Sequence, residues 1–271
     1  MTMATTTASP RASVRAWRTR GFGRLVLTEG KVWVRGSDLF WAVLFPTVLL
    51  LGQAAIAPEL RQIASGDTWA GTPFYGVAVI NVILPAMLAV PIAITALSIM
   101  PATFGGFREK GVLKRFSATP MRPQSMFAAH FIINVTMALA GALIAAIVTS
   151  ALFHILIPNN IAMVVLGFVL GMAAMMALGS LVSARVSRAS TGTVIGNIIF
   201  FPLLLTAGVF TVIKPGTVLY QIARVTTLGA ASQVMSYGWF GGHTFPWIPI
   251  VAMIVWTAVI TPLAVKLFKW R

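Results

Sequence analysis

Six long apolar runs alternate with polar segments along the chain. Each run is close to the length of about 20 residues that an α-helix needs to cross the hydrocarbon core of a bilayer. The pattern predicts an all-α membrane protein whose six transmembrane helices lie at about 39–57, 77–100, 126–157, 161–184, 192–213 and 246–268. The third run is too long for one upright span, so we expect it to tilt or to project beyond the bilayer.

The longest polar stretch inside this apolar pattern covers residues 104–123, between the second and third runs. It holds five basic residues, and each charge would cost about 2.5 to 3.5 kcal/mol in hydrocarbon, so the stretch must lie at the membrane surface. Its pattern predicts a short amphipathic helix that lies flat there. Gly105 and Gly106 are expected to break the incoming span, residues 108–116 carry apolar side chains at helical spacing, and two prolines are expected to stop the helix.

Two further segments are predicted at a membrane surface. Residues 1–37 form an N-terminal arm whose last part mixes apolar, aromatic and basic side chains, as interfacial helices do, while residues 38–271 form the six-span domain. Residues 218–237 are neither polar enough for a free loop nor apolar enough for a span. They predict a short external helix that lies in the outer leaflet or dips into it, followed by a glycine hinge over residues 238–242 into the sixth span.

Composition supports the membrane assignment. Hydrophobic residues make up 58% of the 271 residues and charged residues 9%, whereas a soluble domain has about 25% charged residues. The absence of cysteine excludes disulfide bonds, thiolate nucleophiles and cysteine-based metal sites. We interpret the net charge of +15 as the result of basic loops that orient the protein in the membrane and contact anionic lipids. Membrane lipids are therefore expected partners, and nucleic acid is not.

Lysine and arginine are distributed unequally between the two ends of the predicted spans. Seventeen of the 20 lie in the N-terminal arm, the central polar stretch, the connection between the fourth and fifth spans, or the C-terminal tail. Only Arg61, Lys214 and Arg224 lie on the other side. The positive-inside rule therefore places both termini and the central polar stretch in the cytoplasm.

Small residues and prolines stand out inside the predicted spans. Two small-xxx-small patterns permit close helix contacts, either within the chain or across a dimer: Gly167 with Gly171, and Gly192 with Gly196. Prolines within a span remove a backbone donor and predict kinks. In the fifth span Pro202 and Gly208 are candidate gating kinks, with packing shape alone as the alternative.

No pattern for catalysis or ion coupling is found. No Asp, Glu, Lys or Arg lies near the centre of a predicted span, which argues against an ion-coupled pathway. His130, His154 and His243 are too widely separated for one metal site, and neither an HExxH pattern nor a P-loop is present. We therefore expect that the chain is not an enzyme, carries no cofactor or metal, and receives its energy from elsewhere.

Two stretches resemble the membrane subunits of bacterial ATP-binding cassette exporters of the ABC-2 type, which include drug, polysaccharide and lipid-linked exporters. The first combines residues 108–111, 113–115 and 119–120 of the central polar stretch. The second, residues 201–215 of the fifth span, is similar to the family's pattern of proline, small residues and glycine. The resemblance covers most of the chain, and it departs at residues 226–228, where family members usually carry a proline.

The resemblance implies a permease subunit that works as a dimer, with a second copy or a similar chain, in the cell membrane of a bacterium. A separate ATPase subunit would bind ATP and Mg²⁺, and the substrate exported would be amphipathic or lipid-like, such as a drug, lipid or glycan. The central polar stretch would be the coupling helix that docks into the ATPase. Its apolar residues would anchor the helix and its charged residues would face the ATPase. The residues carried over are Phe107, Arg108, Glu109, Lys110, Gly111, Leu113, Lys114 and Arg115.

Two functions of other classes stay open at this point. An ion-coupled secondary exporter would work without an ATPase, although it would need the membrane-embedded acids that the spans lack. A non-transporting scaffold would anchor a soluble partner through the basic stretch, which would otherwise serve only to set the topology.

Overall fold

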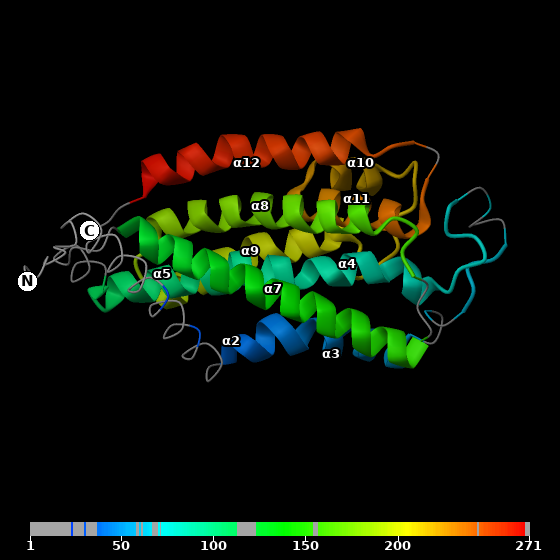
Figure 1. Ribbon diagram of the computed structural model, residues 1–271, viewed down its shortest axis with the longest axis horizontal. Coiled ribbons are helices and arrows are strands. Elements are labelled where there is room, and N and C mark those ends of the chain that lie inside the picture. The colour runs from blue at the N-terminus through cyan, green and yellow to red at the C-terminus, as the bar shows by residue number, and fades with distance from the viewer. Residues whose placement is uncertain are drawn as a thin grey trace, which may run out of the picture.

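The computed structural model describes residues 37–57, 60, 62–66, 70, 72–112, 123–153, 157–242 and 244–268, together with the single positions 23 and 30. This part of the chain is built from helices, the longer of which run side by side along the long axis of the molecule (Figure 1). Two of the segments, η1 and η3, are wide π-helical turns. The elements in chain order are α2 (Ser37–Leu39), η1 (Phe40–Leu44), α3 (Phe45–Ile56), α4 (Val79–Ala93), η3 (Ile94–Ile99), α5 (Met100–Glu109), α7 (Pro123–Phe153), α8 (Ile161–Arg185), α9 (Ala189–Ala207), α10 (Val218–Val225), α11 (Thr227–Phe240) and α12 (Trp247–Leu267).

The all-α membrane fold predicted from the apolar pattern is confirmed. Within the described ranges, five helices are long and apolar enough to cross a bilayer: Val79–Glu109, Ala128–Phe153, Ile161–Arg185, Ala189–Ala207 and Trp247–Leu267. The first predicted span corresponds to a shorter apolar helix, Phe40–Ile56. The helix in the third run has 31 residues, or about 46 Å, against a hydrocarbon core of about 30 Å. The fifth span ends at Ala207, earlier than the apolar run predicts.

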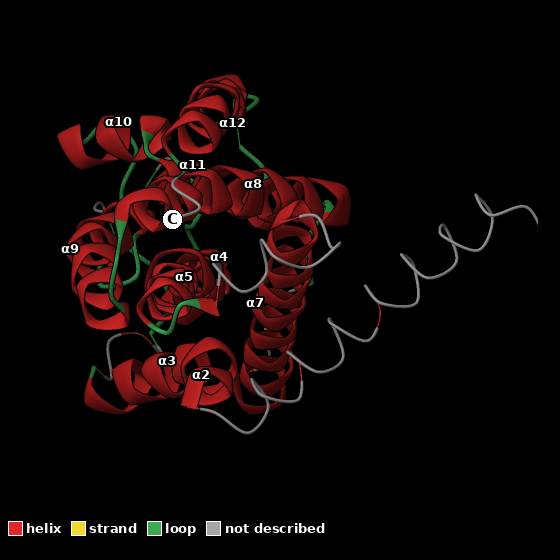
Figure 2. Cartoon of the chain, turned by 90° about the vertical axis from the view of Figure 1, so that its left-hand side faces the viewer, coloured by secondary structure: helices red, strands yellow, loops and turns green. Residues whose placement is uncertain are grey.

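One continuous helix occupies the middle of the bundle. The segments α4, η3 and α5 join into Val79–Glu109, and 94% of its most apolar stretch is buried inside the protein. For the other four long helices, only 22% to 39% of the most apolar stretch is buried inside the protein, so most of their apolar surface is available to contact lipid. Figure 2 looks at the end where this helix finishes, and α5 lies there between α9 and α7, with α3 on one side and α8 and α11 on the other.

The predicted helix break at Gly105 and Gly106 is wrong. The helix runs through both glycines and ends at Glu109, and the chain then turns at Gly111, whose φ is +64°. Gly105 serves a different purpose, because a Cβ atom at this position would collide with the backbone carbonyl of Arg188. The glycine lets α5 approach the turn between α8 and α9 without ending the helix.

The external segment before α12 consists of two helices, where the sequence predicts one. The first, α10, has a single buried residue, Ala223. The second, α11, enters the bundle and packs against α4, α8, α9 and α12, with the side chains of Leu228, Val234 and Met235 fully buried. The predicted hinge is also shorter than expected, because Gly238 lies within α11 and the turn comes at Gly241. The segment therefore combines an interfacial α10 with a re-entrant α11.

Candidate functional site

The end of α5 is held in place by an aromatic cluster. The ring of Phe104 is fully buried and meets the rings of Phe107, His130 and Phe268 edge-on, with centroid distances of 5.9, 5.5 and 6.2 Å. The ring centroid of Phe107 also lies 5.1 Å from that of His130. Since His130 belongs to α7 and Phe268 directly follows α12, the cluster ties α5 to both of these helices. Phe107 thus packs against rings of α5 and α7 of its own chain.

Arg108 binds the end of α8. Its Nη1 donates hydrogen bonds to the backbone carbonyls of Ser183 and Val186, the latter at 2.6 Å, and Nη2 donates to the carbonyl of Ala184 at 3.3 Å. The guanidinium also lies 4.6 Å from the centre of the Phe268 ring. Carbonyls at a helix C-terminus lack intrahelical partners and carry partial negative charge, so a cation is stabilised there.

Glu109 binds the start of α9. One carboxylate oxygen accepts a hydrogen bond of 3.3 Å from the backbone N–H of Ala189, the first residue of that helix. Free N–H groups and the partial positive charge at a helix N-terminus favour a carboxylate. Two neighbouring residues of α5 therefore hold the two helix ends that meet in the α8–α9 turn. We call Arg108, Glu109 and this turn, residues 186–188, the turn clamp.

A row of close backbone contacts joins α9 to the central helix above the turn clamp. A Cβ atom on Gly192 would lie 2.5 Å from the carbonyl oxygen of Pro101, and one on Gly196 would collide with the carbonyl of Leu97. Together with Gly105, these glycines place the backbones of α9 and the central helix in direct contact at three successive turns. A displacement of α5 therefore moves α9 with it.

Two of the charged residues that are expected to face a partner also have contacts within their own chain. The sequence interpretation turns Arg108 and Glu109 toward a partner protein, whereas both bind groups of their own chain. Lys110 is exposed next to them, and Arg185 and Arg188 are exposed on the neighbouring turn. Leu113, Lys114 and Arg115 lie outside the described residues. Within the described ranges, the exposed charges at this site are the basic Lys110, Arg185 and Arg188 and the acidic Glu109.

The remaining glycines singled out in the sequence also face helices of the same chain. A Cβ atom on Gly167 would lie 2.9 Å from a side-chain carbon of Met235, and one on Gly171 would lie 2.5 Å from the side chain of Ala231. Both contacts are with α11, so this small-residue face receives the re-entrant helix.

The candidate kink residues of the fifth span have different positions. Pro202 lies inside α9 on an exposed surface. Gly208 follows the last residue of α9 with φ +83°, and its N–H donates to the carbonyls of Leu204 and Leu205. Gly208 therefore terminates the helix rather than bending it, as glycine commonly does at this position.

Sequence reasoning missed the α8–α9 turn, His130 and Phe268 as parts of this site. Their contacts with α5 join segments far apart in the sequence, and a single sequence contains no signal for such pairs. In the described part of the chain, no three His, Cys, Asp or Glu side chains gather as they would around a metal ion. What the arrangement offers is mechanical: a rigid connection from one exposed point to α5, α7, α8, α9 and the end of α12.

The described basic side chains gather at the end of the bundle that carries the turn clamp. Arg108, Lys110, Arg185, Arg188 and Lys266 lie at or next to the ends of α5, α8 and α12 or the start of α9, which Figure 1 shows at its left, while Lys214 precedes α10 and Arg224 belongs to it, and α10 lies toward the right. This distribution follows the charge asymmetry of the sequence.

Comparison with known proteins agrees with the resemblance noted in the sequence. A search of curated proteins found no match to the chain. The family model described as ABC-2 type transporter matches residues 22–215, a region that contains the first five predicted spans and the whole turn clamp. With most of its length matched, the chain belongs to the ABC-2 type transporter family as a membrane-embedded permease component.

Proposed function

We propose that the chain is the permease subunit of an ATP-driven exporter in a bacterial cell membrane. It works as a dimer, with a second copy or a similar chain, and with a separate ATPase subunit that binds ATP and Mg²⁺. Its substrate is amphipathic or lipid-like, in the class of drugs, lipids and glycans. The basic end of the bundle, with both chain termini, faces the cytoplasm, as the excess of lysine and arginine favours.

The turn clamp is the observation that supports this proposal most directly. Arg108 and Glu109 lie at the exposed tip of a helix whose apolar stretch is 94% buried, and they bind the ends of α8 and α9. A force applied by the ATPase at this tip is shared at once by three helices. Lys110, Arg185 and Arg188 surround the tip and present positive charge to the ATPase, which steers a partner of complementary charge.

The proposal predicts that breaking the turn clamp uncouples the ATPase from the permease. Arg108→Ala removes three hydrogen bonds around the end of α8, and Glu109→Ala removes one to the start of α9. We expect permease-dependent stimulation of ATP hydrolysis to fall about ten-fold or more in each variant. Substrate transport should fall in parallel. The measurement uses the permease and its ATPase reconstituted together in liposomes.

A matched control is Lys266→Ala, which removes an exposed cation at the same end of the bundle but on α12. The Lys266→Ala permease should stimulate ATP hydrolysis about as strongly as the unsubstituted permease does. If Arg108→Ala and Glu109→Ala insert normally and still stimulate ATP hydrolysis fully, the turn clamp has no coupling role. Substrate transport by the permease alone, without ATPase or ATP, would contradict the proposed function as a whole.

A further inference from the structure

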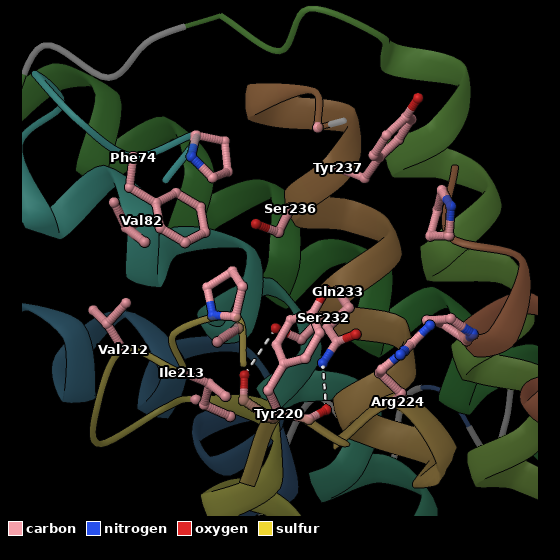
Figure 3. Close-up of a pocket in the computed structure, with 18 of the residues that line it drawn as sticks. Phe74, Val82, Val212, Ile213, Tyr220, Arg224, Ser232, Gln233, Ser236 and Tyr237 are labelled. Carbon is pink, nitrogen blue, oxygen red and sulfur yellow. Dashed lines mark hydrogen bonds between the residues drawn. The ribbon is translucent and has the colours of Figure 1, made fainter. Parts of the chain in front are cut away.

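Two hollows border helix α10. One lies at the end of the molecule opposite the turn clamp, and the other extends from that end along α12 as far as Ile260, with Val225 as its lining residue from α10. The first is a cavity of about 240 Å³ whose wall includes Tyr220, Gln233 and Ser236 as well as apolar side chains such as Phe74 and Val82 (Figure 3). The second is an open groove of about 610 Å³ between α10 and α12. Its lining is apolar and includes Val225, Trp247, Val251, Val255 and Trp256.

Arg224 lies where the two hollows adjoin. It contributes to the wall of the cavity, and its neighbour Val225 contributes to the groove. In Figure 3 the guanidinium lies at the rim, on the side away from Val212 and Ile213. It donates a hydrogen bond of 3.0 Å to the side-chain oxygen of Gln221 and lies 5.9 Å from the centre of the Tyr220 ring.

The described residues provide no anionic partner for Arg224. Asp38 and Glu109 are the two acids in the described part of the chain, and neither lines the cavity or the groove. A guanidinium placed beside an apolar groove at the end of a membrane bundle is a binding position for an anionic headgroup.

The groove has the character of a membrane-facing surface. Only 28% of the apolar stretch of α12 is buried inside the protein. The indole N–H of Trp256 donates to the carbonyl of Val225 at 2.7 Å, which fixes α10 against α12, while the side chain of Trp247 is 66% exposed. Trp247 is the first residue of α12, and tryptophan at the end of a span is typical of the headgroup level of a bilayer, whereas Trp256 lies near the middle of the helix. The groove is thus open to acyl chains from the leaflet at this end.

We propose that Arg224 and the α10–α12 groove bind an anionic phospholipid. The acidic headgroup lies against the guanidinium, and an acyl chain lies along the apolar side chains of α12. A second copy of the chain is a less favourable occupant of the groove. A two-fold contact here would bring the Arg224 side chains of the two copies together, and the described residues provide no acid at this site to neutralise them. The site requires only that the chain spans a membrane, so it stands independently of the export function proposed above.

Fluorescence quenching by brominated lipids tests the site, with Trp247 as the reporter. The purified protein is reconstituted into mixed vesicles in which either phosphatidylglycerol or phosphatidylcholine carries bromine on its acyl chains. The part of the quenching that is lost in Trp247→Phe reports the lipid in the groove. We expect this part of the quenching to show a preference of about five-fold for phosphatidylglycerol over phosphatidylcholine, which corresponds to the attraction of about one cation near a membrane surface for an anionic lipid. Raising the salt to roughly 1 M should reduce this preference, because the Debye length falls to about 3 Å.

Three variants assign the preference to Arg224. In Arg224→Gln, quenching by brominated phosphatidylglycerol and by brominated phosphatidylcholine should become nearly equal. Arg224→Lys keeps the positive charge and should retain the preference for phosphatidylglycerol. Lys214→Gln, which removes the other described cation at this end, should leave it unchanged. Equal quenching by the two lipids in the parent protein overturns the proposal. Three further results would also overturn it: a preference for phosphatidylglycerol that survives in Arg224→Gln, a fall in Lys214→Gln equal to that in Arg224→Gln, or a preference that does not change with salt.

Discussion

Arg108 and Glu109 are adjacent in the chain, yet each side chain binds a different helix end. Arg108 binds three carbonyl groups around the end of α8, and Glu109 binds the first N–H group of α9. Each charge next to a helix end of opposite partial charge contributes about 0.3 to 1 kcal/mol, and charge-assisted hydrogen bonds add to this. The pair therefore fixes the short α8–α9 turn as well as the tip of α5.

Glycine at position 196 is expected to be indispensable for packing. A Cβ atom there would collide with the carbonyl of Leu97 in the central helix, so Gly196→Ala forces two backbones apart. We predict a loss of about 1 to 3 kcal/mol in the free energy of unfolding, as overpacking usually costs. Thermal unfolding in detergent gives the measurement.

Gly52→Ala is the matched control for this substitution. Gly52 is also helical, but a Cβ atom at this position meets nothing within 4 Å. The substitution should keep or slightly raise the unfolding temperature, because alanine favours a helix over glycine. Equal losses in the two variants would contradict the packing role of Gly196.

At the scale of elements, the apolar pattern predicts the long helices well, but it predicts one helix in place of α10 and α11 and leaves open whether that helix lies in the outer leaflet or dips into it. A span in lipid must be apolar, so length and composition reveal it. α11 contains polar residues that point to a surface, yet the structure satisfies them inside the bundle. Ser232 donates to the carbonyl of Ala207 at 2.8 Å, and Gln233 donates to the carbonyl of Tyr220 at 3.2 Å. Such partners lie in other segments, so the sequence alone cannot supply them.

The different environments of α10 and α11 predict different rates of hydrogen exchange. α10 lies at the surface with one buried residue, whereas most of α11 is buried among four helices. Backbone amides of α11 should therefore exchange at least about ten-fold more slowly than those of α10, since they require a larger opening. Hydrogen–deuterium exchange with mass spectrometry in detergent measures this. Equal rates in the two helices would contradict the burial of α11 in the bundle.

At the scale of the whole molecule, the charge distribution predicts the orientation in the membrane. The chain has no cysteine, so single cysteines can report on either side without a background. Cysteines replacing Arg188 and Lys266 should react with a membrane-impermeant maleimide only after the cells are permeabilised. A cysteine replacing Thr217, which is exposed at the opposite end, should react in intact cells. The reverse labelling pattern would exclude contact between the turn clamp and a cytoplasmic ATPase.

The functional site itself was only partly predictable from the sequence. The position of the basic stretch and the inward role of Phe107 follow from the alternation of polar and apolar residues. The direction of Arg108 and Glu109 does not, because it depends on the α8–α9 turn, about 75 to 80 residues further along the chain. The break expected at Gly105 fails for a related reason: a glycine that ends a helix and a glycine that admits a neighbouring backbone look the same in one sequence.

The unbroken helix Val79–Glu109 has a consequence for communication across the membrane. Its last residues carry the turn clamp, and near its first residues Val82 and Ala86 line the cavity at the opposite face. The helix has 31 residues, and its regular hydrogen bonding is interrupted near the middle by Pro85, Pro91 and the π-helical segment η3, where a helix bends most readily. Under the proposed function, a push at the turn clamp would reach the cavity wall through this one helix, and η3 is the point at which the helix could bend on the way.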